Sequence, residues 1–251
     1  MPMRIDILTI FPEMFGPVLS TSIPGRAQQA GLVQVNTVNI RDFTTNKHLK
    51  VDDRPFGGGP GMVMGCQPIW DAVKSTEAID AATPATRILM TPEGIPLHDT
   101  LVGRLALEPR LLIIAGRYEG VDERVIEALD PIRISTADVV LSGGEIPAML
   151  LIDAVIRRLP DALGHEASAE EDSFAMTDAD GCPLVDCPHY TRPREWAGRQ
   201  APEILMSGDH QEVERWRMEQ RIARTREFRP DLLDRDAIDR RHRMPRQLNN
   251  D

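Results

Sequence analysis

Short aliphatic runs alternate with helix-spaced segments over residues 1–160, and this alternation constrains the fold of the 251-residue chain more than any other feature. A run such as LLIIA at 111–115 is typical of a strand buried on both faces, whereas residues 146–159 have helical spacing with a proline in the first turn. Alternating β and α segments predict an α/β domain with an open parallel sheet and helices on both of its faces. We expect strands over 4–10, 32–40, 87–90, 111–115 and 139–141, and helices over 67–79, 101–107, 122–129 and 146–159.

Three of the expected strands run into a turn that contains glycine. These turns are Thr91–Gly94, Gly116–Gly120 and Ser142–Gly144. Ligands of open α/β sheets bind beyond the carboxyl ends of the strands, and glycine lets the backbone approach a ligand closely. The sequence therefore predicts that the three turns converge on one pocket. Taken singly, each turn is as typical of a plain connection between a strand and a helix as of a ligand loop.

The glycine-rich stretch at 57–61 does not complete a phosphate-binding loop, because it lacks the Lys and Ser/Thr that would hold phosphate and metal. The GxGxxG, HExxH and GxSxG patterns are also missing from the sequence. These findings argue against nucleotide triphosphate hydrolysis. The stretch is more typical of a flexible loop.

The character of the chain changes after residue 162. Residues 163–188 are acidic and lack apolar periodicity, which is typical of a linker, although a general base could also come from the carboxylates and histidine of 164–174. Residues 189–251 are rich in arginine, and their clearest helix spans 209–224 with Asp209 as its cap. We expect an α/β domain over 1–162, a linker over 163–188 and a small, mainly helical domain over 189–251.

Charge and cysteine content limit the partners and the compartment. The formal net charge of -10 argues against a protein that coats nucleic acid nonspecifically, because phosphate neutralisation needs Lys and Arg. The basic residues are nearly all Arg, which is typical both of a phosphate-contacting surface and of a GC-rich genome. Three cysteines without a CxxC pair suit a reducing cytoplasm, and no run approaches the roughly 18–20 apolar residues of a membrane span. We expect a cytoplasmic protein without a membrane segment.

A set of sequence motifs runs in order through most of the chain. The set consists of Ile10–Phe15, Arg41–Phe43, Val51–Met62, Gly116–Arg124, Val140–Glu145, Leu163–Ser168, Glu171–Phe174 and Cys187–Pro193. Each motif is weak alone, but the ordered set is specific. It resembles the bacterial tRNA (guanine-N1)-methyltransferases, the TrmD family of the SPOUT class.

The resemblance implies a deep trefoil knot in the first domain and a homodimer whose active sites are shared between subunits. It implies that S-adenosylmethionine binds in the knot and that the anticodon arm of tRNA is the substrate. The methyl group would go to N1 of the guanine at position 37, 3′ of the anticodon, preferably after another guanine. Members of the family also depend on Mg²⁺, but the sequence has no standard metal motif, so the metal ligands stay unknown.

The same resemblance implies roles for individual residues. N1 of guanine carries a weakly acidic proton, so a base must remove it, and the charge then spreads to O6. Asp172 is implied as the general base, Arg157 as the group that stabilises O6, and Glu119 as a residue near the cofactor or the guanine. The implied cofactor site is Leu89, Met90, Thr91, Pro92, Gly116, Tyr118, Gly120, Ser135, Thr136, Ala137, Asp138, Val139, Val140, Leu141, Gly143, Gly144 and Pro147, and the implied tRNA contacts are His189, Arg192, Arg215, Arg217, Arg221 and Arg224.

The chain departs from the family pattern in two places. Thr91 and Glu93 stand in a turn where Ser-Pro-Gln-Gly is common, so the hydroxyl is kept and a charge is added. Residues 175–185 are longer than the typical linker. Two alternatives stay open beside the base methyltransferase: a related SPOUT enzyme that methylates a ribose 2′-hydroxyl, and a noncatalytic RNA-binding protein on the same fold.

Overall fold

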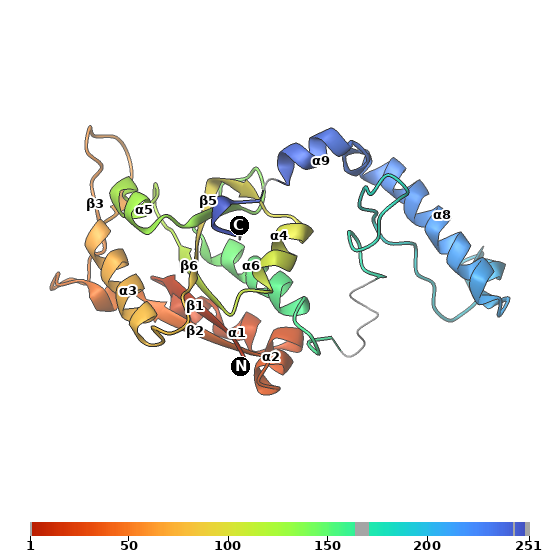
Figure 1. Cartoon of the computed structure of the whole chain (residues 1–251), viewed down its shortest axis with the longest axis horizontal. Helices are drawn as coiled ribbons and strands as arrows, with labels where there is room; N and C mark the ends of the chain where they lie inside the picture. The colour runs from red at the N-terminus through yellow and green to blue at the C-terminus, as the bar shows by residue number, and fades with distance from the viewer. Residues whose placement is uncertain (1, 164–170, 243, 249–251) are drawn as a thin grey trace. The chain divides into compact units, whose positions relative to one another are not determined.

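The computed structural model describes residues 2–163, 171–242 and 244–248 (Figure 1). Contacts between Cα atoms divide the chain into unit 1, residues 1–164 with 242–251, and unit 2, residues 165–241. The chain therefore leaves unit 1 and returns to it, whereas the expected helical domain ran on to residue 251. Residues 164–170 lie outside the described residues. They include most of the family motif at 163–168 and belong to the first part of the expected linker.

A five-stranded parallel sheet forms the centre of unit 1, in the order β2-β1-β6-β5-β7 (Figure 1). The expected open parallel sheet is therefore confirmed. Its strands are β1 (Met3–Thr9), β2 (Val33–Asn39), β5 (Thr86–Pro96), β6 (Arg110–Ala115) and β7 (Ile132–Ser135). A separate antiparallel pair joins β3 (Asp52–Asp53) to β4 (Val63–Met64).

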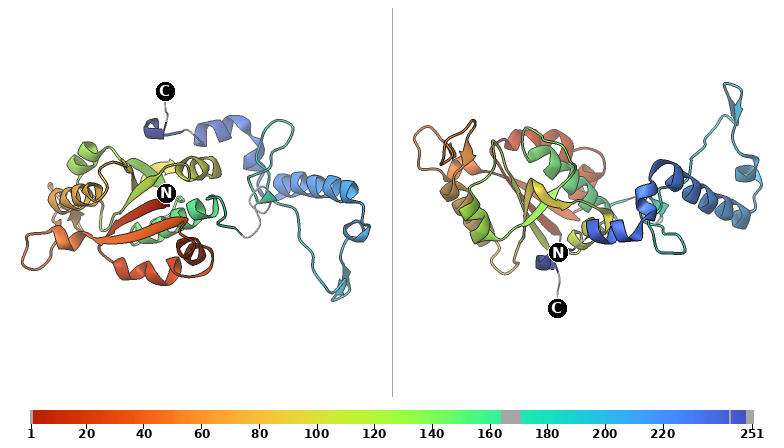
Figure 2. Two further views of the ribbon diagram at one scale, coloured as in Figure 1. Left: turned by 60° about the horizontal axis from the view of Figure 1, so that its bottom comes forward. Right: turned by 90° about the horizontal axis from the view of Figure 1, so that it is seen from above.

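Helices cover both faces of this sheet because alternate strand residues point to opposite sides (Figure 2). Ile5 and Ile7 belong to one buried cluster, while Leu8 belongs to the other. The first cluster is closed by α1 (Gly16–Leu19), α2 (Ser22–Gln29), α4 (Asp99–Leu105) and α6 (Glu145–Arg157), and the second by α3 (Cys66–Ala78) and α5 (Glu123–Leu129). Each expected helix of this region is present, with its bounds shifted by a few residues.

The strand expected at 139–141 is wrong. Ile132–Ser135 forms the edge strand instead, and residues 139–141 are exposed, with Val140 at 90%. An apolar run becomes a strand only where a neighbouring strand supplies backbone partners, and here β7 already occupies the sheet edge. The turn expected at 91–94 is part of β5, which continues to Pro96 with a register shift between Met90 and Ile95.

Unit 2 is built around α8 (His210–Phe228), which is longer than the expected 209–224 and is capped as expected by Asp209. Within the expected linker, Phe174 and Leu184 pair through their backbones, and Leu184 is buried. The other elements among the described residues of unit 2 are β8 (Glu195–Trp196), β9 (Arg199–Gln200), α9 (Arg235–Arg241) and 3-10 turns at Glu203–Met206 and Pro230–Leu233. In unit 1, 3-10 turns lie at Pro12–Met14, Ile40–Phe43 and Arg246–Leu248. No helix among the described residues is both long and apolar enough to cross a membrane.

Candidate functional site

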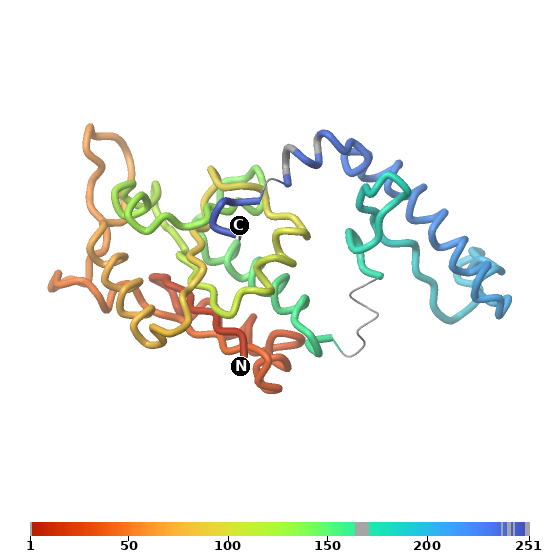
Figure 3. Tube along the Cα trace, in the orientation of Figure 1, coloured from red at the N-terminus to blue at the C-terminus, as the bar shows by residue number. Residues whose placement is uncertain are grey.

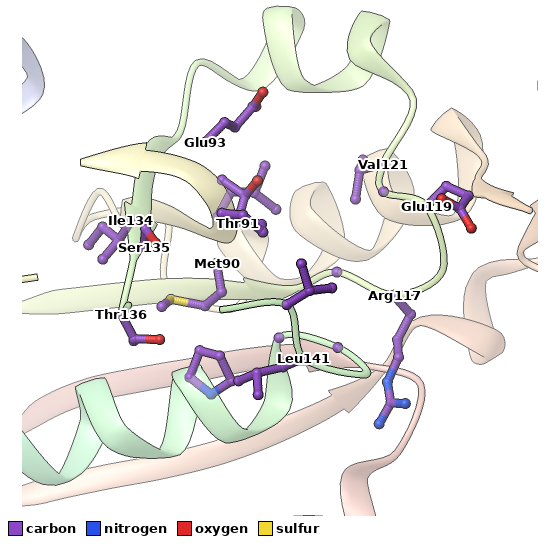
Figure 4. A pocket seen from close by; sticks show the side chains of 18 of the residues that line it. Met90, Thr91, Glu93, Arg117, Glu119, Val121, Ile134, Ser135, Thr136 and Leu141 are labelled. Atoms are coloured by element: carbon purple, nitrogen blue, oxygen red, sulfur yellow. The ribbon is translucent and has the colours of Figure 1, made fainter. Parts of the chain in front are cut away.

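A cavity of about 390 Å³ lies at the carboxyl ends of β5, β6 and β7 (Figure 4). Its walls include residues 89–93 from β5, residues 116–121 after β6, and residues 134–137, 139–141 and 143–144 from the end of β7 onward. The expected convergence of the three glycine-bearing segments is thus confirmed, although the first of them lies within β5 and not in a turn. The volume falls within the range of small-molecule sites in proteins. In Figure 4, Ile134, Ser135 and Thr136 lie on one side of Met90, and Val121 and Glu119 lie on the other.

Close backbone approach requires glycine at Gly94, next to the cavity-lining Glu93, and at Gly144 in the cavity wall. A Cβ atom at Gly94 would lie 2.4 Å from the amide nitrogen of Ile134, and one at Gly144 would lie 2.9 Å from Cα of Ala115. The Gly144 amide also donates to the Gly116 carbonyl over 2.8 Å. The glycines therefore let loops that are distant in sequence lie directly against one another and shape the cavity.

A buried carboxylate fixes the loop that follows β6. Glu145 is fully buried at the start of α6; Arg117 donates to its Oε2 over 2.8 Å, and the hydroxyl of Thr9 donates to its Oε1 over 3.0 Å. The Arg117 guanidinium also lies 4.5 Å from the ring centre of Phe11 and donates to the Ser142 carbonyl. These contacts join the ends of β1 and β6 to the start of α6, so they hold two walls of the cavity in register. Sequence reasoning missed this cluster, whose one local sign is an acidic residue in the first turn of a helix.

The cofactor residues implied by the family resemblance line this cavity, except Asp138, which is exposed outside its lining. Glu119 also lines it, and its side chain lies over Gly61, where a Cβ atom would come within 2.2 Å of Oε1. The Glu119 amide donates to the Met62 carbonyl, so backbone hydrogen bonding connects the 57–64 stretch to the Gly116–Gly120 turn. The lining residues that the sequence assigned neither to the cofactor nor to catalysis are Glu93, Arg117, Val121, Glu123, Ile126 and Ile134.

A charged bridge stands at the rim of the cavity. Arg133 donates to Glu93 over 2.5 Å and to Glu123 over 2.6 Å. The charge that Glu93 adds to the turn is therefore paired, and it links β5 to β7 and α5. The pairing with Arg133 compensates the charge that Glu93 introduces where the family pattern has glutamine.

The other two expected catalytic residues lie elsewhere. Arg157 is the last residue of α6, whereas Pro147, near the start of the same helix, lines the cavity. Ten residues of helix separate them by about 15 Å. Asp172 is half-buried in unit 2. Within unit 1, the cavity thus brings together the cofactor residues and Glu119, but not Arg157.

The expected tRNA-contacting residues of unit 2 differ in exposure. The side chains of His189 and Arg215 are 79% and 67% exposed, while that of Arg221 is only 2% exposed. Arg221 contacts Asp186 and Glu214, so we do not include it among the proposed tRNA contacts. Arg217 is partly exposed, and the Arg224 guanidinium lies 5.4 Å from the ring centre of Phe228.

One group of metal-ligand types occurs among the described residues, formed by Asp186, Cys187 and His189. Its Asp186 carboxylate already accepts from His189 over 2.8 Å and contacts Arg221. Burial opposes ionisation of Asp186, but hydrogen bonds from His189 and from the Cys187 amide outweigh it and lower the pKa of the carboxyl group. A thiol and an imidazole do not fit Mg²⁺, which takes oxygen ligands.

Known proteins resemble this chain over most of its length. The profile of the family described as tRNA (Guanine-1)-methyltransferase TrmD matches residues 3–235. A tRNA (guanine-N(1)-)-methyltransferase of Pseudomonas putida (strain W619) is 52% identical over 236 residues, which cover 94% of this chain and 92% of that protein. The corresponding protein of Pelotomaculum thermopropionicum is 47% identical over 241 residues, which cover 96% and 94%. The chain therefore belongs to the tRNA (guanine-1)-methyltransferase family.

Proposed function

We propose that this chain transfers a methyl group from S-adenosylmethionine to N1 of the guanine at position 37 of tRNA, preferably where a guanine precedes it. Methyl transfer to N1 of a tRNA guanine follows from membership of the family and from the names of the relatives. The observation that carries the cofactor assignment is the cavity built from three loops at the carboxyl ends of parallel strands. The proposal also includes methylation at position 37, the preference for a preceding guanine and a cytoplasmic location.

The cavity fits a ligand that has both apolar and polar parts. Leu89, Met90 and Ile134 offer apolar surface, while Thr136 and Ser135 offer hydroxyl groups. Backbone groups of the Gly116–Gly120 turn and of residues 141–144 complete the wall, as expected for a site that holds a nucleoside and an amino acid moiety. S-adenosylmethionine, when bound, supplies a methyl group carried on a positively charged sulfur. The protein's task is to hold this donor and to prepare the guanine.

Asp172 is proposed to take the proton from N1 of guanine, which leaves a lone pair for the new N–CH₃ bond and negative charge on O6. Arg157 is proposed to donate hydrogen bonds to O6, since a cation stabilises the charge as it develops. Glu119 lines the cavity and is proposed to orient the guanine or the donor there. The target base must leave its stack to reach these groups.

A homodimer with shared active sites is proposed from the position of Arg157. This residue stands about 15 Å along α6 from the cavity-lining Pro147, so a single subunit does not bring it to the donor. The exposed apolar side chains of Val140, Ile146 and Leu150 support a subunit contact next to the cavity, at 90%, 57% and 50% exposure. In a dimer, Arg157 of one subunit can serve the cavity of the other.

A knotted path is proposed for unit 1. The chain after β7 passes the turn after β6, where Arg117 pairs with Gly143 and the Gly144 amide donates to Gly116. Such a crossing of distant loops supports the trefoil knot implied by the family resemblance. The proposed mechanism assigns no ligands to a magnesium ion, because the described Asp186–Cys187–His189 group does not fit one.

Unit 2 is proposed to hold the anticodon arm through Arg192, Arg215, Arg217, Arg224 and His189. Arginine contacts to phosphates position a tRNA without reading its sequence. The acidic net charge of the whole chain is compatible with this because three of the proposed arginines lie on one helix, α8.

Methylation of an unmodified tRNA transcript with guanines at positions 36 and 37, using labelled S-adenosylmethionine, tests the function. We expect the label on N1 of guanine 37. Asp172→Asn is expected to lower turnover by roughly 10²–10⁴-fold, as removal of a general base does, while donor and tRNA binding persist. Glu171→Gln, which removes the neighbouring exposed carboxylate, is the matched control and should keep full turnover. Label on a ribose would indicate the 2′-hydroxyl enzyme, and no transfer at all would indicate the noncatalytic protein.

A further inference from the structure

A segment beyond the family match packs against unit 1. The family profile ends at residue 235, yet residues 242 and 244–248, here called the strap, belong to unit 1 (Figure 3). Family membership therefore does not explain why this segment leaves unit 2 and returns to the sheet domain.

Apolar burial anchors the strap. Leu248 is 3% exposed and belongs to the same buried cluster as Leu101 of α4 and Ile132 of β7. Met244 packs partly against that cluster. A side chain buried to this degree is part of a hydrophobic core, so the strap packs into the core of unit 1 through Leu248.

Polar contacts fix the register of the strap. Arg104 of α4 donates to the Leu248 carbonyl over 2.9 Å, and Arg246 contacts the Asp130 carboxylate over 2.7 Å. Gln247 also donates to Asp130. Asp130 has a left-handed backbone at the end of α5, so its carboxylate stands at a fixed point just before β7. Side chains from α4 and from the end of α5 thus hold the segment from two directions.

An aromatic stack marks the point where the strap begins. The rings of His242 and His98 lie 4.0 Å apart and are nearly parallel, at 6°. His98 also caps α4 by accepting a hydrogen bond from the Leu101 amide. The strap therefore contacts both ends of α4, at His98 and at Arg104.

We propose that the strap is a second attachment of unit 2 to unit 1, which confines unit 2 and thereby strengthens its binding of tRNA. The chain leaves unit 1 after residue 164 and returns at 242, so a docked strap gives unit 2 a tether at each end. A tether raises the effective concentration of one binding surface near another without any new contact to the ligand. The tRNA part of this proposal rests on the proposed function, whereas the docking itself does not.

Two matched truncations test the proposal. A chain that ends at Arg241 lacks the strap, and a chain that ends at Leu248 keeps every described contact of it. A third variant, Leu248→Asp, keeps the full length but removes the apolar anchor. Hydrogen exchange of the α4 amides reports docking, and the Kd for an unmodified tRNA transcript reports the tether; a methylation assay of the full chain is run separately.

Loss of the strap is expected to speed exchange in α4 by roughly tenfold and to raise the Kd for tRNA about 3–10-fold, in both the Arg241-ending chain and Leu248→Asp. The Leu248-ending chain should match the full chain in both measurements. Unchanged exchange in α4 would show that the strap does not dock. Faster exchange with an unchanged Kd for tRNA would overturn the tether. A full chain that binds tRNA but does not methylate it would reject the proposed function and leave this inference to be decided by the same two measurements.

Discussion

Among the residues whose burial the structure describes, units 1 and 2 each bury one arginine, and they accommodate it differently. Arg110 of unit 1 is fully buried, contacts the buried Asp6 carboxylate over 3.0 Å and donates to the Thr76 and Asp80 carbonyls over 2.6 and 2.9 Å. Arg221 of unit 2 reaches Asp186 and Glu214 only over 3.3 and 3.4 Å, and its Nε has no hydrogen-bond partner among the described residues. The Arg110 charge is thus fully paired within unit 1, whereas the contacts of the Arg221 charge are longer and fewer.

The surroundings of the two arginines explain this difference. In unit 1 two aliphatic clusters fill both faces of a five-stranded sheet. Among the described residues of unit 2, the buried apolar side chains are Cys182, Leu184, Cys187 and Leu232. Because apolar burial is the main favourable contribution to folding, unit 1 can position a polar network rigidly, and unit 2 depends more on polar contacts and on what it binds. This contrast agrees with the proposed roles, in which unit 1 places the donor cavity and unit 2 binds tRNA.

Replacing each buried arginine by methionine is expected to give the largest difference in stability between the two units. Arg110→Met leaves Asp6 buried with weaker compensation, which is expected to cost roughly 3–5 kcal/mol in the free energy of unfolding. Arg221→Met leaves Asp186 paired with His189 and is expected to cost no more than about 1 kcal/mol. Urea unfolding followed by tryptophan fluorescence measures both, since Trp70 lies in unit 1 and Trp196 and Trp216 lie in unit 2. Equal losses would remove the contrast between the two units.

Two glycines of unit 1 test how tightly the cavity wall is packed. Gly94→Ala would place Cβ against the backbone of Ile134, so we expect a loss of roughly 1–3 kcal/mol in unfolding free energy and weaker binding of S-adenosylmethionine. Gly103→Ala, on α4, meets no atom within 4 Å and should be neutral or stabilising by up to about 1 kcal/mol. Calorimetric titration with the donor and thermal unfolding check both. Normal donor affinity in Gly94→Ala would mean that the wall yields easily.

Acid should weaken unit 1 before it affects the Asp186 contacts of unit 2. Burial, together with the charge of His242, lowers the pKa of His98 from 6.5 to about 4. The unfolded chain therefore binds a proton at His98 that the folded chain rejects, and stability falls as pH drops from 6.5 toward 4, by roughly 1–2 kcal/mol after solvent screening. The lowered pKa of Asp186 acts at more acidic pH, because its contribution is complete above the usual carboxyl value and is lost only below it.

Denaturant unfolding at pH 7 and pH 5 measures this effect, and His98→Asn is the matched variant. Asparagine can still accept the hydrogen bond that caps α4, but it does not titrate. The variant should lose most of the pH dependence of unit 1 in this range. An unaltered pH dependence in His98→Asn would assign it to other groups.

Much of the fold and of the cavity could be predicted from sequence because these features depend on local pattern. The LLIIA run became the central strand β6, and Asp209 caps α8 as expected. Glycine turns after strands predicted the cavity for the same reason, since the carboxyl ends of parallel strands meet at one edge. The Val139–Leu141 run was misjudged because an apolar run is equally compatible with a strand and with an exposed loop.

The sequence by itself determined the parallel sheet, the three loops at its edge and, through its ordered motifs, the family of the chain. Only the tertiary structure decided that Glu145 is buried against Thr9, 136 residues away, that Arg221 is enclosed in unit 2, and that the strap returns to α4. The physical reason is range. Periodicity and turn chemistry act between near neighbours in the chain, whereas burial and charge pairing depend on which distant segments meet once the chain has folded.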